Sequence, residues 1–114
     1  MTYQKNLKIL IFTGDESQQV IDHLTEQGFP KVSFEDMPSQ IEHLSQAGQH
    51  RIISNDMPSL MAYETLKHDF PTEVSLVFVG SEKNQNELAQ QADYSVSSEP
   101  TAIKELLEKL DFSL

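Results

Sequence analysis

Short apolar runs alternate along the chain with longer segments whose apolar residues recur every three or four positions. The short runs predict buried strands, and the longer segments predict amphipathic helices. The expected strands are Leu7–Phe12, Lys31–Phe34, Arg51–Ile53, Val74–Val79 and Tyr94–Ser97. The expected helices are Ser17–Gln27, a segment from Ile41 to near Gly48, Leu60–Phe70, Asn84–Gln91 and a segment around Ile103–Leu110.

Five strand–helix units in succession predict a parallel sheet covered by helices on both faces, a three-layer α/β/α sandwich. At 114 residues, this pattern favours the flavodoxin-like strand order 2-1-3-4-5. We expect residues 1–114 to form one domain, whether alone or as part of a longer protein. The residues expected to form the core are Ile9, Ile11, Ile53, Val77 and Val79 of the sheet, packed against Ile103, Leu106 and Leu110 of the last helix.

Charge and composition narrow the possible functions. Eighteen acidic residues oppose eight basic ones, which gives a net charge of −10. This charge argues against nucleic-acid binding and favours a basic partner surface. The chain has no cysteine, which excludes disulfides and thiolate chemistry. No apolar stretch approaches the roughly 20 residues that cross a bilayer, and the polar N-terminus lacks a signal-peptide core. We therefore expect a cytoplasmic protein without membrane contact.

Two segments resemble parts of a known family. Residues Ile52–Ser59 read IISNDMPS, and residues Ala92–Ser98 read ADYSVSS. The first resembles the end of the third strand in the receiver domains of bacterial two-component response regulators, where a Met-Pro pair follows the phosphoacceptor aspartate. The second resembles the fifth strand of that family, in which an aromatic residue precedes an essential lysine.

The resemblance places different residues at every reacting position. Ser54 stands where the family has its phosphoacceptor, and Ser97 stands where it has the lysine. Thr13 and Gly14 stand where the family has its metal-binding acids. The resemblance therefore implies a pseudo-receiver without phosphotransfer, which is a binding module and not an enzyme, and which needs no cofactor or metal. Its vestigial pocket would comprise Thr13, Gly14, Asp15, Ser54, Asp56, Gly80 and Ser97.

Two alternatives remain open. In the first, a slip of one residue lets Asp15, Glu16 and Asp56 rebuild an acidic magnesium pocket in an active receiver. This requires Ser54 and Asn55 to occupy strand positions that should be apolar. In the second, the chain is a flavin-binding or small-ligand-binding domain of flavodoxin-like fold. The segment Thr13–Ser17 would then form a phosphate loop, or the rim hydroxyl groups would line a small-ligand pocket. A simpler interpretation of this segment is that Asp15 caps the helix that follows it.

Receiver domains commonly dock partners through their fourth helix, fifth strand and fifth helix. The resemblance therefore implies that this face binds a protein partner or a second copy of the chain. The residues expected there are Gln91, Tyr94, Ser95, Lys104 and Glu108. Tyr94 is the expected anchor, because tyrosine combines a large apolar ring with a polar tip. The competing interpretation is that Tyr94 serves only the core and that Lys104 and Glu108 pair on a solvated helix face.

Overall fold

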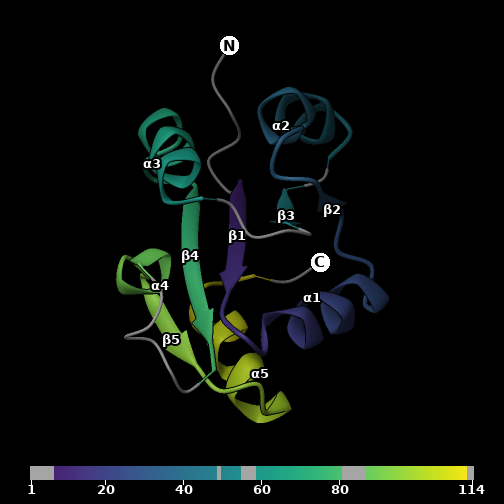
Figure 1. Cartoon of the computed structure of the whole chain (residues 1–114). Helices are drawn as coiled ribbons and strands as arrows, with labels where there is room; N and C mark the ends of the chain where they lie inside the picture. Colours follow the sequence, from purple (N-terminus) through teal and green to yellow (C-terminus); the bar gives the residue numbers. More distant parts are fainter. Residues whose placement is uncertain (1–6, 49, 55–58, 81–86, 113–114) are drawn as a thin grey trace.

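The fold is centred on a five-stranded, all-parallel sheet (Figure 1). The computed structural model describes residues 7–48, 50–54, 59–80 and 87–112. The strands are β1 (Lys8–Thr13), β2 (Lys31–Val32), β3 (Arg51–Ser54), β4 (Val74–Val79) and β5 (Tyr94–Val96). The helices are α1 (Ser17–Glu26), α2 (Met37–Gln46), α3 (Leu60–Asp69), α4 (Glu87–Gln90) and α5 (Pro100–Lys109).

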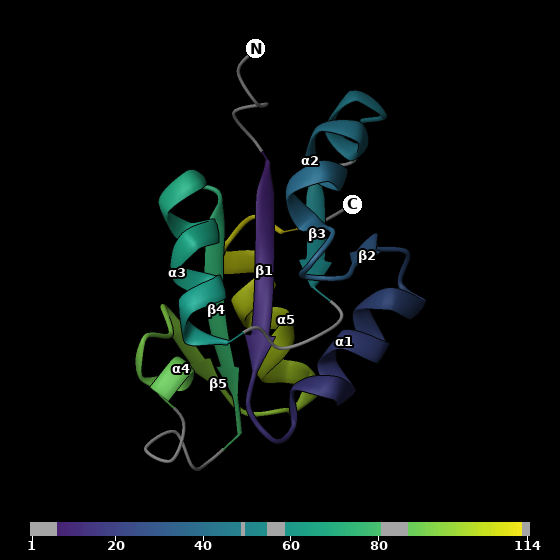
Figure 2. The same ribbon diagram turned by 45° about the horizontal axis from the view of Figure 1, so that its top comes forward.

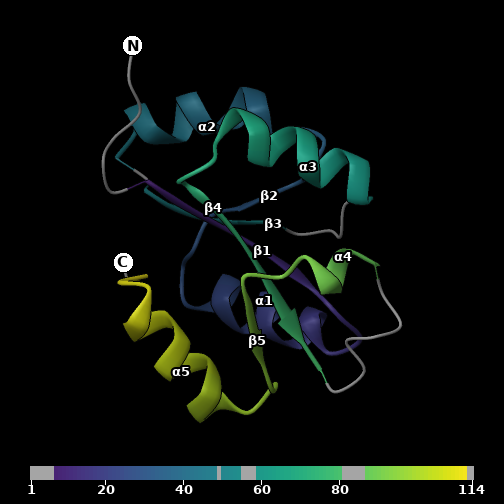
Figure 3. The ribbon, with the colours of Figure 1, turned by 90° about the vertical axis from the view of Figure 1, so that its left-hand side faces the viewer.

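The helices form two layers on opposite faces of the sheet. In Figure 3 the helices α2 and α3 lie above the sheet, and α1 and α5 lie below it. Figure 2 shows α3 and α2 in front of the strands, with α5 behind them. The expected three-layer α/β/α sandwich is thus confirmed. Within the described residues, every helix is too short or too polar to cross a membrane.

The order of the strands differs from the expected one. The sheet runs β2-β3-β1-β4-β5, so β3, and not β1, is the neighbour of β2. Strands adjacent in sequence lie side by side in only about two thirds of cases. Here the α1 connection carries the chain past β3, and the α3 connection carries it past β1. This order places the two six-residue strands, β1 and β4, together at the centre, where their pairing runs from Ile9↔Val74 to Thr13↔Phe78.

The core consists of two apolar clusters, one on each face of the sheet. Ile9 and Ile11 belong to the cluster beneath α2 and α3. Ile53, Val77 and Val79 belong to the cluster beneath α1 and α5. All five are buried as predicted. Ile103 and Leu106 of α5 are buried, and Leu110, which follows the helix, is half-buried against the same cluster.

Phe112, just after α5, is a core residue that the sequence pattern did not indicate. Asp111 adopts a positive φ of 53°, and the amide of Phe112 donates to the carbonyl of Leu107 at 2.8 Å. This hydrogen bond is characteristic of the Schellman motif, which ends a helix and turns the chain back towards it. The turn buries Phe112 against Phe29, with ring centroids 4.9 Å apart.

The two copies of the Asp-Met-Pro-Ser sequence begin helices in different ways. The first copy contains the start of α2, which begins at Met37. The second copy, Asp56–Ser59, ends immediately before α3, and its last residue caps that helix. The Ser59 hydroxyl accepts a hydrogen bond from the amide of Ala62 at 3.2 Å. The other residues of the second copy lie outside the described part of the chain.

Candidate functional surfaces

The carboxyl ends of the central strands bring together part of the predicted pocket. Thr13 ends β1 and is fully buried, and Gly14 follows it with a φ of +109°. Thr13 pairs with Phe78 of β4. Gly80, with a φ of +140°, follows β4 and donates its amide to the carbonyl of Val96 in β5 at 3.2 Å. The carboxyl ends of β1, β4 and β5 therefore meet at this edge.

The chain's own backbone fills the space where the loop after β1 meets the end of β4. An added Cβ on Gly14 would lie 2.2 Å from the carbonyl oxygen of Val79. The amide of Glu16 approaches the same oxygen to 3.4 Å. In open α/β sheets, ligands bind in the crevice at such strand ends. Here the start of the loop after β1 packs directly against the end of β4. A glycine directly after a buried strand was the sequence signal for this close approach.

Ser54 does not lie at the same level as Thr13. Ile53 pairs with Leu10, so Ser54, the next residue, ends β3 below the level at which Thr13 ends β1. Ser54 is fully buried and pairs with Val32 of the edge strand β2. The structure thus places the expected phosphoacceptor position inside the sheet and separates it from the rim residues.

The remaining pocket residues are distributed over the rim. Asp15 and Ser97 are exposed. The neighbouring Ser98 links the loop after β5 to the loop after β1, because its hydroxyl group donates to the Glu16 carboxylate at 2.5 Å. Glu16, and not Asp15, occupies the N-cap position of α1, without a side-chain cap, so the expected capping by Asp15 is wrong. Asp56 lies outside the described residues.

The described segments offer no metal-binding cluster of side chains. They contain no group of three His, Asp or Glu side chains that could hold a metal ion. Glu16 is the rim acid with a defined partner, and its carboxylate is already engaged by a hydroxyl group. This hydrogen bond between Glu16 and Ser98 joins the loop after β1 to the loop after β5.

The expected docking residues do not form one face, because the sheet and α5 lie between them. Tyr94 packs against the cluster beneath α1 and α5. Side chains alternate along a strand, so Ser95 points to the opposite face of the sheet. Lys104 and Glu108 line the side of α5 that faces α1. Gln91 is exposed in the turn after α4.

Tyr94 is partly covered by its own domain. It is half-buried, and the Lys109 ammonium group lies 5.5 Å from the centroid of its ring. This arrangement is a cation–π contact across the edge of the sheet. Part of the apolar area that made Tyr94 attractive as an anchor is therefore used to pack α5 on β5.

A polar network joins α3 to the start of β5. The Asp93 carboxylate accepts the amide of Leu76 at 2.9 Å, and the Asp93 amide donates to the Leu76 carbonyl at 2.8 Å. Lys67 of α3 lies 3.9 Å from the same carboxylate. Burial, together with the negative charge of Asp93, raises the pKa of Tyr63 to about 12. Through its two hydrogen bonds with Leu76, Asp93 fixes the position at which β5 begins to pair with β4.

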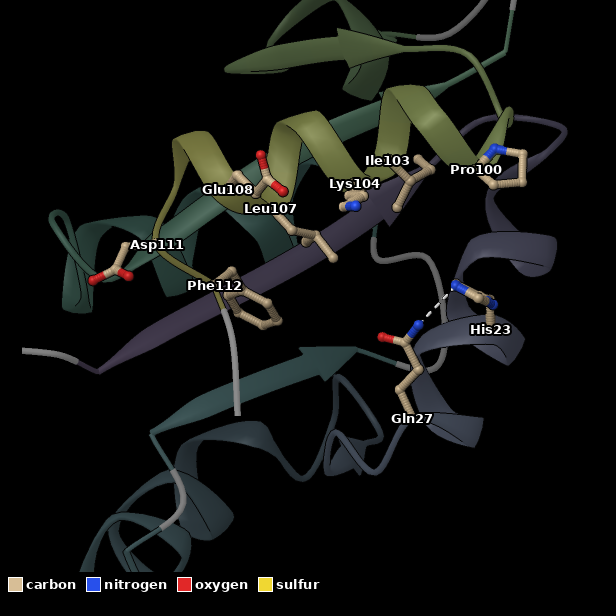
Figure 4. A pocket seen from close by; sticks show the side chains of 9 residues that line it. All are labelled: His23, Gln27, Pro100, Ile103, Lys104, Leu107, Glu108, Asp111 and Phe112. Carbon is tan, nitrogen blue, oxygen red and sulfur yellow. Dashed lines mark hydrogen bonds between the residues drawn. The ribbon is translucent and has the colours of Figure 1, made fainter.

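A groove of about 550 Å³ separates α1 from α5 (Figure 4). Ile103, Leu107 and Phe112 supply its apolar lining. His23 and Gln27 of α1 form the opposite wall and share a hydrogen bond of 2.9 Å. The other residues that line the groove are Pro100, Lys104, Glu108 and Asp111. No feature of the sequence alone indicated this groove, because its walls come from opposite ends of the chain.

The fold defines an α/β/α protein of the open-sheet class, and sequence comparison adds no family to that description. No protein-family model matches the chain. A search of curated proteins likewise found no match.

We predict that Gly14→Ala destabilises the domain far more than Gly48→Ala. Both glycines have a positive φ, +109° and +87°, but the space around Gly48 is open. Positive φ alone costs an alanine about 1–2 kcal/mol, and overpacking against the Val79 carbonyl adds about 1–3 kcal/mol. Urea unfolding of the two variants measures the difference. Equal losses of stability would show that Gly14 does not approach β4 closely.

We also predict an alkaline loss of stability that depends on Tyr63. Because its pKa in the folded protein, about 12, lies above the usual value near 10, the unfolded chain releases this proton first. The stabilising contribution is complete below about pH 10 and declines towards about pH 12, by at most about 3 kcal/mol. Unfolding curves between about pH 9 and pH 11 should therefore fall more steeply for the wild type than for Tyr63→Phe. Parallel curves would contradict this assignment.

Proposed function

We propose that this domain is a phosphorylation-independent protein-interaction module. The observation that supports this proposal most strongly is the packing of the loop after β1 against β4. This packing places backbone where the sheet architecture would otherwise hold a ligand. A buried Ser54 below the rim and the contact between Ser98 and Glu16 support the same conclusion. The outer surface of α1 and α5, in contrast, has an open groove.

The strand order of this domain differs from that of receiver domains, so the proposed role does not depend on descent from them. Receiver domains share the flavodoxin-like order in which β1 lies between β2 and β3. In this chain β3 lies between β2 and β1. The two segments that resemble receivers therefore occur in a sheet with a different order, and a receiver kinship would have to account for that difference.

One observation favours the alternative of an active receiver with a displaced acidic pocket. That alternative requires Ser54 and Asn55 to belong to a strand; β3 extends through Ser54, and Asn55 lies outside the described residues. The pocket would also require Glu16 to give up its hydrogen bond with Ser98 and bind a cation. The third acid of this pocket, Asp56, lies outside the described residues. A phosphorylation assay therefore separates the two functions.

Incubation with acetyl phosphate and Mg²⁺ should leave the intact mass of the domain unchanged. Ser54 is fully buried, which shields its hydroxyl group from acetyl phosphate, and a serine hydroxyl is a weak nucleophile at its ordinary pKa. Intact-mass spectrometry would detect the addition of one phosphoryl group. Ser54→Asp should also remain unmodified, because a carboxylate at this level of β3 lies below the rim and the described residues hold no cluster of acids that could bind Mg²⁺ beside it. A stable adduct on Asp56 of the wild type would instead establish the active-receiver alternative.

A further inference from the structure

The groove between α1 and α5 extends along the whole of α5. Its lining includes Pro100, Ile103, Lys104, Leu107, Glu108 and Asp111. Residues at this spacing lie on one side of a helix. They run from Pro100, the first residue of α5, to Asp111, two residues past its end. Because α5 has ten residues, the groove is about 15 Å long. A partner helix of about ten residues has a matching length, and helices commonly bind such grooves through an apolar stripe.

The C-terminal end of the groove is fixed by contacts to the sheet. The Lys8 amine donates to the carbonyl of Leu110. The Arg51 guanidinium donates to the carbonyl of Asp111 at 3.0 Å. Phe112 is held by its hydrogen bond to Leu107 and by its stacking on Phe29. These contacts preorganise the apolar lining, which lowers the entropic cost of binding a partner.

The charges around the groove favour a basic occupant. Glu108 and Asp111 line it directly, and Lys104 is the cation that the described lining contains. Asp111 already lies 3.9 Å from Arg51, so Glu108 is the acid of the lining that a basic partner would meet. The exposed acids Asp22, Glu26 and Glu105 lie on the same two helices. A second copy of this chain would bring a further charge of −10 to the contact, which disfavours self-association by like-charge repulsion.

We propose that this groove binds a basic amphipathic helix of a partner protein. The inference rests on the proposed interaction role and specifies where the partner binds and what its chemistry is. The helix would place about three apolar side chains, at positions i, i+3 or i+4, and i+7, along the groove against Leu107, which is half-buried, and its lysines or arginines near Glu108. Lys104 and Glu108 then act in recognition on the α1 side of α5, away from Tyr94.

A synthetic probe tests this inference. The probe is a 14-residue amphipathic peptide with leucines on one face and lysines on the other. Its controls are a scrambled peptide of the same composition and a counterpart with glutamates in place of lysines. NMR titration of the ¹⁵N-labelled domain should show saturable amide shifts at His23, Ile103, Leu107 and Phe112 with the lysine helix only. Equal shifts with the scrambled peptide, or no saturable shifts at these amides, would overturn the proposal.

Two charge reversals on α5 provide a matched pair. Glu108→Lys and Glu105→Lys change the net charge equally, and both positions are exposed, but only Glu108 lines the groove. Glu108→Lys should weaken binding of the lysine peptide about fivefold, and Glu105→Lys should weaken it less than about twofold. Equal effects of the two variants would show that the peptide binds through general charge attraction, and would overturn the proposal that it binds in the groove.

The same titration separates failure of the groove from failure of the proposed function. Saturable shifts confined to Gln91, Tyr94 and Ser95 would overturn the groove and leave the interaction role in place. A dimer detected by sedimentation and dissociated by Glu108→Lys would replace the partner helix with a second copy, and would also overturn the proposal. A phosphoryl adduct, measured separately, would overturn the interaction role itself.

Discussion

The close approach of Gly14 to β4 is the contact on which the functional interpretation depends. β1 lies between β3 and β4, so the loop after it leaves the sheet at the centre of the carboxyl edge. Gly14 adopts a positive φ there and comes so near the Val79 carbonyl that a Cβ would not fit. Because glycine tolerates this conformation without a side-chain clash, the loop can occupy the crevice that other open sheets use for ligands.

Because of this packing, the carboxyl edge of the sheet and the outer helices differ in how open they are to a partner. At the edge, Ser98 and Glu16 bind each other, and Ser54 is buried below the rim. On the outside, α5 is anchored at its C-terminal end by Lys8 and Arg51 and leaves an elongated groove beside α1. Chemistry at the edge would require these loop contacts to open. Binding at the groove would require no rearrangement of the described backbone.

The sequence predicted the elements and layers well, because hydrophobic periodicity is a local property. It also predicted the core positions of Ile9, Ile53 and Val77, whose burial follows from their places in apolar runs. It did not predict the strand order, because β1, β3 and β4 are all apolar enough to be interior strands. Phe112 was missed because its burial depends on the positive φ of Asp111. The groove was missed because α1 and α5 are adjacent only in the folded chain.

The most direct test of the closed edge is an NMR titration of the ¹⁵N-labelled domain with Mg²⁺ and beryllofluoride, a phosphoryl mimic. Our account predicts that the amides of Gly14, Asp15 and Gly80 keep their positions, because the loop after β1 already occupies this space. Saturable shifts of these three amides, dependent on both Mg²⁺ and beryllofluoride, would contradict the account and establish a phosphate pocket at the carboxyl edge of the sheet.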